Sequence, residues 1–383
     1  MFHILTLNKI SADGLSNFDE KEFTCADAFD APDAVIVRSA SMHEMVIPES
    51  VQAIARAGAG VNNIPVEDCT KKGIVVFNTP GANANAVKEL VICAMLLASR
   101  RVVPAISWCG TLKGSGSEVG KLVEKGKGNF AGPEIKGKTL GLVGLGAIGI
   151  LVANAAVDLG MKVIGYDPYL TDAAAAALKE NVAITADINA VFTKSNYISL
   201  HAPATETTKG MINAEAFEKM KDGVRILNFA RAELVNGADL LAALESGKCA
   251  AYATDFPSDE MLGVDGIIAI PHLGASTPES EENCAAMAVV ELREFLTNGN
   301  IINSVNFPNV ELAKEGNGNR LCVISETAVE EAILEALTGA RVLAKAAKAK
   351  KAADTLVDTA DELSAEQIEK VKAIPGVIKI RVI

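Results

Sequence analysis

Thr139-Leu140-Gly141-Leu142-Val143-Gly144-Leu145-Gly146-Ala147-Ile148-Gly149 is the stretch of this 383-residue chain that decides the fold. Its apolar start predicts a strand, the glycine pattern G-x-G-x-x-G follows directly, and a helical pattern continues to Leu159. Gly144 permits a tight turn, Gly146 lets a pyrophosphate approach the backbone, and Gly149 lets helix and strand pack closely. The free N–H groups at the start of such a helix bind phosphate, so the stretch predicts a dinucleotide site.

Asp167 supports this interpretation and indicates which dinucleotide binds. It ends the next apolar run and lies 18 residues after Gly149, close to the spacing expected for a carboxylate on the adenosine ribose. A carboxylate there repels a 2′-phosphate, which favours NAD over NADP. Two simpler interpretations stay open: a glycine turn that only packs, and an aspartate that only begins the turn at Pro168.

The pattern around this motif predicts an α/β fold with doubly wound parallel sheets. Helical stretches alternate with strands, and the one at 239–246 stops at Gly247. Residues 107–138 are rich in Gly and Lys and predict an arm outside the core. The expected strands are 34–37, 73–78, 139–143, 162–166, 196–200, 224–229, 250–254 and 266–270, and long helices are expected at 85–101 and 278–298.

The C-terminal part predicts a separate small α+β module. A glycine–asparagine linker at 316–319 precedes it. The Ala/Lys-rich run 344–353 is expected to be a solvated helical or loop face. The other expected elements are a strand at 320–325, a helix near 328–338, a strand near 355–358, a helix at 364–373 and a strand at 376–383.

Composition narrows the class of protein. Hydrophobic residues make up 49% and charged residues 22%, and the length predicts two or three domains. A net charge of −12 disfavours nucleic-acid binding. Apolar runs are too short to span a membrane and no signal peptide is evident, so we expect a cytoplasmic protein. Seven scattered cysteines and four histidines predict free thiols and no metal site.

Three polar residues near the ends of successive apolar runs suggest one catalytic site. They are Arg231, Glu260 and His272, and carboxyl ends of parallel strands meet at one edge of a sheet. Arginine clamps a carboxylate with two parallel hydrogen bonds. Histidine can take the proton of an alcohol while hydride leaves for a nicotinamide, and a nearby glutamate would orient it and favour its charged form. Each residue alone also fits an ordinary solvated position.

With these residues in place, the chain resembles the D-isomer-specific 2-hydroxyacid dehydrogenase family, particularly the branch that acts on phosphoglycerate. The resemblance covers nearly the whole chain. The matching segments are Val37-Arg38-Ser39-Ala40, Arg56-Ala57-Gly58-Ala59-Gly60-Val61-Asn62-Asn63, Asn78-Thr79-Pro80-Gly81, Tyr166-Asp167-Pro168-Tyr169, His201-Ala202-Pro203 and His272-Leu273-Gly274-Ala275-Ser276-Thr277.

The resemblance implies three domains. A discontinuous, flavodoxin-like substrate-binding domain would comprise 1–98 and 275–308, and a Rossmann NAD-binding domain would comprise 99–274. Residues 319–383 resemble an ACT domain with a regulatory or assembly role. The family also implies a homodimer or homotetramer.

The resemblance further implies a role for each matching residue. His272 would be the acid/base, Glu260 its partner and Arg231 the carboxylate clamp. The substrate would also contact Arg38, Ser39, Asn62 and Asn85. The cofactor would be NAD, held by Gly144, Gly146, Ala147, Ile148, Gly149, Asp167, His201, Pro203, Thr208, Ala230, Asp255 and Gly274. The implied reaction oxidises 3-phospho-D-glycerate to 3-phosphohydroxypyruvate in serine biosynthesis.

The sequence departs from the family pattern at two places, and two other functions stay open. Only 12 residues separate Glu260 from His272, a shorter loop than usual. The turn at 326–329 has no glycine for an amino-acid ligand to approach, so we expect no strong inhibition by serine. The alternatives are a hydroxypyruvate or glyoxylate reductase of the same family, and an NAD-sensing protein without turnover.

Overall fold

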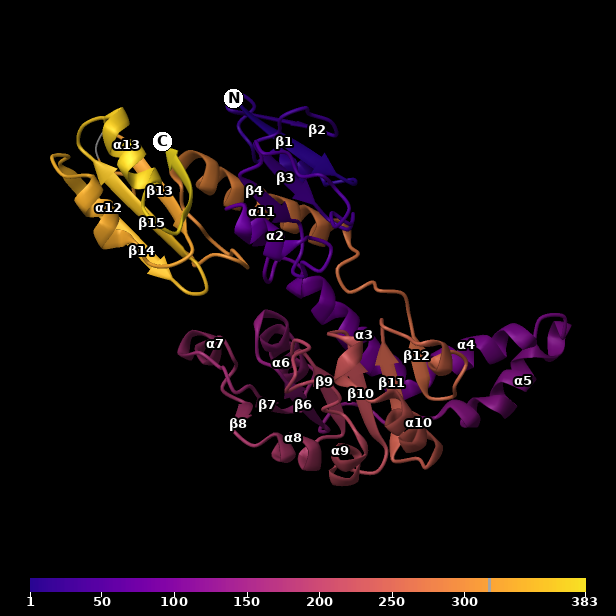
Figure 1. Ribbon diagram of the computed structural model, residues 1–383. Helices are drawn as coiled ribbons and strands as arrows, with labels where there is room; N and C mark the ends of the chain where they lie inside the picture. The colour runs from indigo at the N-terminus through magenta and orange to yellow at the C-terminus, as the bar shows by residue number, and fades with distance from the viewer. Residues whose placement is uncertain (316–317) are drawn as a thin grey trace. The chain divides into compact units, whose positions relative to one another are not determined.

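A computed structural model describes residues 1–315 and 318–383, so part of the predicted 316–319 linker lies outside the described residues. The chain divides into two compact units. One unit combines residues 1–83 with 278–383, and the other comprises residues 84–277 (Figure 1). The first unit is discontinuous because α11 (Pro278–Asn298) returns the chain to the sheet formed by the N-terminal residues.

The first unit contains a five-stranded parallel sheet in the order β2-β1-β3-β4-β5. This is the flavodoxin-like order, and the prediction of a second doubly wound sheet is confirmed. Both faces are covered, because β3 is buried at every position. Helices α1 (Ala12–Leu15) and α2 (Val66–Lys71) connect strands, and α11 packs on one face. The strands are β1 (Phe2–Leu7), β2 (Phe23–Ala26), β3 (Ala34–Val37), β4 (Ala53–Arg56) and β5 (Val75–Asn78).

The second unit contains a seven-stranded sheet in the order β12-β11-β10-β9-β6-β7-β8, with every neighbouring pair parallel. This is the Rossmann order extended by one strand, as the alternating pattern predicted. The strands are β6 (Thr139–Val143), β7 (Lys162–Tyr166), β8 (Val182–Thr185), β9 (Tyr197–Leu200), β10 (Val224–Asn228), β11 (Cys249–Thr254) and β12 (Ile267–Ala269). Its helices include α6 (Ala147–Asp158), α7 (Asp172–Ala176), α8 (Ile188–Lys194), α9 (Ala214–Lys219) and α10 (Gly237–Glu245).

The long helix α3 (Ala84–Arg100) belongs to this second unit. The sequence had assigned residues up to 98 to the substrate-binding domain. The structure groups α3 with the Rossmann sheet because Val87, Val91 and Met95 pack into the core around Leu140 and Leu142. The spacing of apolar residues predicted the helix but could not show which sheet its apolar face covers.

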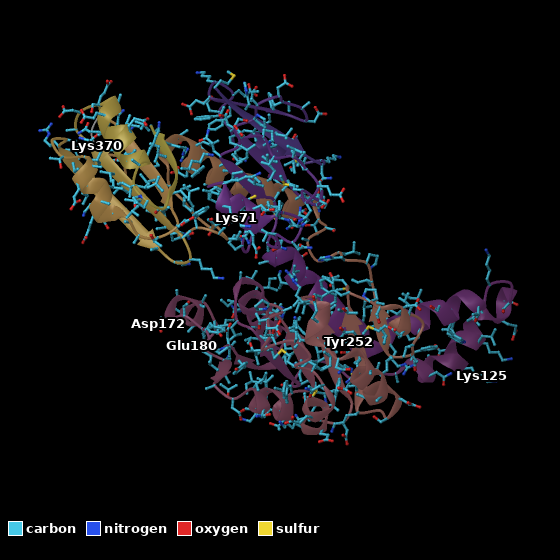
Figure 2. The ribbon with its side chains drawn as sticks, viewed as in Figure 1. Lys71, Lys125, Asp172, Glu180, Tyr252 and Lys370 are labelled. Atoms are coloured by element: carbon cyan, nitrogen blue, oxygen red, sulfur yellow. The ribbon has the colours of Figure 1, made fainter. Side chains whose placement is uncertain are left out.

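The predicted arm is helical. It consists of α4 (Val102–Thr111), α5 (Val119–Gly126) and short 3-10 turns, and neither helix buries a residue. The two helices extend away from the sheet of their own unit, and side chains such as Lys125 project around them (Figure 2). The rings of Trp108 and Phe130 lie 5.3 Å apart and join its beginning to its end.

The C-terminal module is an antiparallel sheet in the order β14-β15-β13-β16 with two helices. Its order of elements is βαββαβ, which adds one strand, at 342–349, to the elements expected from the sequence. One face of the sheet packs against the helices through Leu321, Val323 and Val357. The elements are β13 (Arg320–Ser325), α12 (Glu330–Ala336), β14 (Val342–Ala349), β15 (Ala353–Thr359), α13 (Ala365–Lys372) and β16 (Val377–Val382).

The Ala/Lys run was expected to be a solvated helical or loop face; much of it is exposed to solvent, but most of it is a strand and not a helix or loop. Most of the run forms β14, which pairs along its length with the fully buried strand β15. Pairing with a buried neighbour overrides the weak strand propensity of Ala and Lys. The lysines suit an edge strand, because their charges disfavour pairing with another chain.

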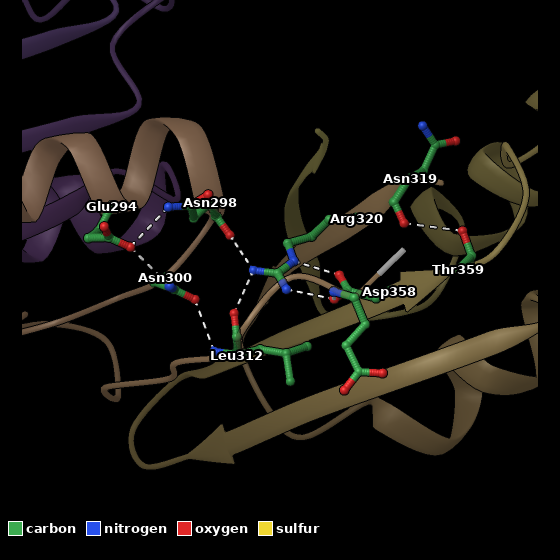
Figure 3. Close-up of polar contacts among 9 residues, drawn as sticks. Glu294, Asn298, Asn300, Leu312, Asn319, Arg320, Asp358 and Thr359 are labelled. Carbon is green, nitrogen blue, oxygen red and sulfur yellow. Dashed lines mark hydrogen bonds and ion pairs between the residues drawn. The ribbon is translucent and has the colours of Figure 1, made fainter. Parts of the chain in front are cut away.

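A buried polar network joins the module to the rest of the first unit (Figure 3). Arg320 is 0% exposed and forms two 2.6 Å hydrogen bonds with the carboxylate of Asp358, which is 1% exposed. Its remaining donors reach the carbonyl oxygens of Asn298, the last residue of α11, and of Leu312, each at 2.8 Å. On the neighbouring strand Arg381 donates to the carbonyl of Phe295, also on α11. The module therefore docks on the C-terminal end of α11.

Within the described ranges, no single helix is both long and apolar enough to cross a membrane; α3 and α4, bent by 62°, reach that length and composition only as a pair. The described residues also contain no cluster of three or more His, Cys, Asp or Glu side chains arranged to hold a metal ion.

Candidate active site

The three glycines after β6 are required for three different reasons. Gly144 has φ +99°, and a Cβ there would lie 2.6 Å from the carbonyl oxygen of His201. A Cβ on Gly149 would lie 2.2 Å from the carbonyl oxygen of Gly144, so this glycine allows α6 to pack against the turn. A Cβ on Gly146 would meet nothing within 4 Å. Because Gly146 is the N-cap of α6, that open space lies where a phosphate can meet the helix N-terminus.

This difference gives a test of the loop. Gly146→Ala is expected to raise the dissociation constant for NADH about tenfold or more, because the methyl group enters the phosphate site while the fold tolerates it. Gly149→Ala is the matched control and is expected to lower the melting temperature instead, since its methyl group overlaps Gly144. NADH fluorescence titration and thermal unfolding measure the two effects. Equal losses of stability in both variants would contradict this assignment.

The loop lies at the switch point of the sheet. β6 has β7 on one side and β9 on the other, and ligands of such sheets bind outside the carboxyl ends of strands at this place. Asp167 follows β7; its two oxygens accept from the N–H groups of Leu145 and Tyr169, each at 2.8 Å. A carboxylate has about four acceptor sites, so capacity remains for a ribose hydroxyl.

His201 follows β9 on the other side of the loop. Its Nε2 lies 2.9 Å from Ser199 Oγ. Burial lowers the pKa of His201 to about 4, so the ring is neutral near pH 7. A neutral imidazole here adds no positive charge to the cofactor site, and the positive end of α6 remains the main feature that attracts phosphate.

A cavity of about 680 Å³ opens beside these residues. Six predicted cofactor residues line it: Gly144, Gly146, Asp167, His201, Pro203 and Thr208. The sequence analysis missed the apolar part of the lining, formed by Ile188, Phe192, Met211 and Ala216. Ile188 and Phe192 are four residues apart on α8, a spacing that could have revealed their shared face. Polar groups at one end and apolar side chains at the other fit a pyrophosphate with an adenosine.

The predicted catalytic residues follow three adjacent strands. Asn228, Thr254 and Ala269 lie in register across β10, β11 and β12. Arg231 and His272 each come three residues after their strand ends, and both are exposed. The ring of His272 packs on Phe256, with centroids 4.7 Å apart. The sheet thus brings a guanidinium and an imidazole to one edge.

Asp255, which follows β11 between them, is the buried carboxylate of this edge. It is 3% exposed. Its Oδ2 accepts from the N–H of Gly274 at 3.3 Å, and its Oδ1 has no hydrogen-bond partner among the described residues. Burial raises the pKa of Asp255, and the charges of His272 and Arg231 act to lower it. The side chains of His272 and Arg231 are therefore close enough to interact electrostatically with this carboxyl group.

Glu260 is placed differently from the expectation. Its carboxylate is exposed and accepts a 2.8 Å hydrogen bond from Ser258, and no ion pair with His272 forms among the described residues. The cause is the 3-10 turn Asp259–Met261, in which the buried side chain of Met261 anchors the loop and leaves Glu260 outward. The short loop thus separates the two groups in this structure.

The predicted substrate residues fall into both units. In the first unit, Arg38 pairs with Glu281 at 2.7 Å, and the N–H of Ser39 donates to Asn8. The loop containing Asn62 reaches the same place, because its neighbour Asn63 donates to the carbonyl of Ala40 at 2.8 Å. In the second unit, Asn85 donates to Glu89 of its own helix.

Arg56 is a basic residue at the same edge that the sequence analysis did not select. It ends β4, next to β3, and its Nε donates to the carbonyl of Arg38 at 3.0 Å. The signal was available, since both arginines end neighbouring apolar runs. Two guanidinium groups at one sheet edge can bind a second anionic group of a substrate.

Comparisons with known proteins point to one enzyme family. Residues 92–274 match the family described as D-isomer specific 2-hydroxyacid dehydrogenase, NAD binding domain. A hydroxypyruvate reductase of Thermotoga maritima is 40% identical over 262 residues, which cover 65% of this chain and 80% of the reductase. A D-3-phosphoglycerate dehydrogenase of Bacillus subtilis is 36% identical over 80% of this chain and 59% of that enzyme.

Solved structures lead to the same group. The NAD⁺-bound 3-phosphoglycerate dehydrogenase of Entamoeba histolytica is 30% identical, with a TM-score of 0.62 over 80% of this chain and 98% of that one. The chain spans only about half to three-fifths of the length of several curated relatives, including 50% of the human D-3-phosphoglycerate dehydrogenase. With its glycine loop, Asp167 and the matched fold, the chain belongs to the NAD-dependent D-isomer specific 2-hydroxyacid dehydrogenase family.

Proposed function

We propose that the protein oxidises 3-phospho-D-glycerate to 3-phosphohydroxypyruvate with NAD⁺, as in serine biosynthesis. The observation that carries this proposal is the convergence of Arg231, Asp255 and His272 at adjacent strand ends, in the unit that holds the glycine loop. Relatives named D-3-phosphoglycerate dehydrogenase, at 33–36% identity, support the choice of substrate. Formation of NADH from 3-phosphoglycerate, compared with D-lactate and glycerate, tests it directly.

The proposed chemistry assigns one task to each side chain. Bound NAD⁺ supplies the hydride acceptor. Arg231 holds the substrate carboxylate in a two-bond clamp, which fixes the neighbouring alcohol carbon. His272 takes the alcohol proton as the C2 hydrogen leaves as hydride, and returns a proton to the ketone in the reverse direction.

Two carboxylates can assist His272 in this scheme. Asp255 already lies close enough for its charge to act on the ring. Glu260 is proposed as the partner that reaches His272 when substrate binds, since catalytic hydrogen bonds are often long in the free enzyme. The Glu260 side chain is exposed and accepts a hydrogen bond from Ser258 of its own loop, which leaves room for this rearrangement.

Arg38, Ser39 and Asn62 are proposed to hold the substrate phosphate and backbone, and Asn85 is also proposed as a substrate-binding residue. Arg56 next to Arg38 supplies a second cation for a dianionic group. A competing function within the family is reduction of hydroxypyruvate, favoured by the 40% identity to a hydroxypyruvate reductase. An unphosphorylated substrate needs no second anion site, which separates the two functions.

Arg38→Gln is therefore expected to raise KM for 3-phosphoglycerate about tenfold or more, with little change in KM for hydroxypyruvate. A charge-assisted contact to one phosphate oxygen accounts for a loss of that size. Lys71→Gln removes an exposed positive charge elsewhere on the first unit (Figure 2) and serves as the control. Equal effects of Arg38→Gln on both substrates would favour the reductase.

We further propose a cytoplasmic homodimer or homotetramer whose C-terminal module, resembling an ACT domain, serves assembly and not strong inhibition by serine. Backbone pairing supports the module's βαββαβ fold, and the turn after β13 has no glycine to admit a ligand. Light scattering of the purified chain measures the assembly. Sub-millimolar inhibition by serine would contradict the second part.

A further inference from the structure

The hairpin of β14 and β15 presents lysines on both of its faces, and the two faces differ. Lys345 pairs at 2.6 Å with Glu330 of α12, on the face covered by the module's helices. Lys348 lies three residues further along β14, so it projects from the opposite face, and Lys350 follows the end of the strand. Within the described part of the chain, neither Lys348 nor Lys350 has a carboxylate oxygen within 4.0 Å.

A polar cavity of about 380 Å³ lies against these two lysines. Its other walls come from the end of β5 and from the loop after α11, both in the first unit. The lining contains four amide or hydroxyl side chains, two ammonium groups and no Asp or Glu: Asn78, Asn303, Ser304, Pro308, Asn309, Lys348, Ala349 and Lys350. The lining is therefore positively charged, although the chain as a whole has a net charge of −12.

Hydrogen bonds hold the asparagine side of the cavity, Asn78 and Asn303, in place. Asn303 adopts a left-handed conformation, φ +59°, and its side chain donates to the buried carboxyl of Glu291 at 2.9 Å. Its carbonyl accepts from the N–H of Asn78 at 3.3 Å. Burial raises the pKa of Glu291 to about 8, so the group behind this wall is mostly uncharged near pH 7 and does not oppose an anion.

We propose that this cavity is a binding site for a small multivalent oxyanion, a phosphate ion or a phosphomonoester. Two ammonium groups can neutralise a dianion, and the side chain of Asn309, which has no hydrogen-bond partner among the described residues, supplies a neutral donor. No lining residue is among those assigned above to substrate or NAD. Because Lys348 and Lys350 belong to the module and Asn78 to the first sheet, a bound anion ties the hairpin to that sheet.

Binding therefore has two measurable consequences. Inorganic phosphate or glycerol 2-phosphate, at constant ionic strength against chloride, is expected to bind the full chain in calorimetry. Backbone amides of 342–359 are expected to exchange more slowly with solvent when the anion is bound. Use of both ions separates free phosphate from a phosphomonoester as the preferred form.

Three variants test whether the anion binds at this cavity. The double variant Lys348→Gln/Lys350→Gln is expected to lower anion affinity about tenfold or more, since it removes two charge-assisted contacts. Lys351→Gln, which changes the next residue of the same turn outside the cavity lining, is expected to bind as the unmodified chain does. Binding and its dependence on the two lysines are expected to persist in Arg38→Gln, which disables the proposed substrate-phosphate contact. Equal affinities of the double variant and Lys351→Gln, or loss of all binding in Arg38→Gln, would overturn the proposal.

Discussion

Replacement of His272 by asparagine is expected to lower kcat for oxidation of 3-phosphoglycerate by about 10²–10⁴-fold, the usual contribution of a positioned general base. Asparagine keeps a polar group of similar reach but cannot accept the alcohol proton. Affinity for NADH is expected to change little, because His272 does not line the cavity beside the glycine loop. Steady-state kinetics and NADH titration measure the two quantities. A kcat within a factor of a few of the unmodified protein would exclude His272 as the base.

The same assay decides which carboxylate assists His272. Glu260→Gln and Asp255→Asn are matched changes, since each replaces a carboxyl group by an amide of the same size. If Glu260 joins His272 when substrate binds, both variants lose activity, and Glu260→Gln retains its affinity for NADH. If the arrangement of the free protein persists, Asp255→Asn alone has a large effect, because Asp255 is the buried carboxylate next to the ring. An unchanged kcat in Glu260→Gln would remove Glu260 from the mechanism.

Most strands of the two parallel sheets could be predicted, because each of these is a short apolar run that ends at a polar residue or glycine, whereas β2, β4 and β8 were not expected. Parallel strands covered on both faces leave that signature in any such chain. The glycine loop could be predicted equally well, since Gly144 and Gly149 answer local steric demands and Gly146 leaves open space for a phosphate. The sequence did not predict the position of α3. A helix with a wide apolar face can cover either of two sheets, and only long-range packing decides which one it covers.

The sequence predicted which residue types lie at the strand ends that form the site. It did not predict the direction in which each side chain points. Spacing along the chain suggested that Glu260 meets His272, yet the burial of Met261 turns Glu260 outward. The same spacing gave no reason to rank Asp255 as the nearer carboxylate. The strand β14 escaped prediction because Ala and Lys have little strand preference of their own, and β15 supplies the pairing.

Breaking the ion pair of Arg320 and Asp358 is expected to lower the stability of the fold strongly, because both side chains are buried. Burial acts to raise the pKa of Asp358, but hydrogen bonds from Arg320 and from the N–H of Glu315 outweigh it and hold this pKa below its ordinary value. The guanidinium also binds two carbonyl groups outside the module (Figure 3). Removal of Arg320 would leave a buried carboxylate and two carbonyls without their donors, which costs more than the ion pair contributes.

Arg320→Met is therefore expected to destabilise the first unit by about 3–5 kcal/mol, the usual cost of breaking a buried pair from one side. Denaturant unfolding measures this loss, and faster amide exchange in β13 and β15 would locate it. The double variant Arg320→Met/Asp358→Leu is the control. It is expected to recover most of the stability, because it removes the stranded carboxylate and fills the space with apolar atoms. If both variants are equally unstable, the contacts of Arg320 with Asn298 and Leu312, and not the ion pair, hold the module on α11. If Arg320→Met is as stable as the unmodified chain, the network in Figure 3 contributes nothing to docking.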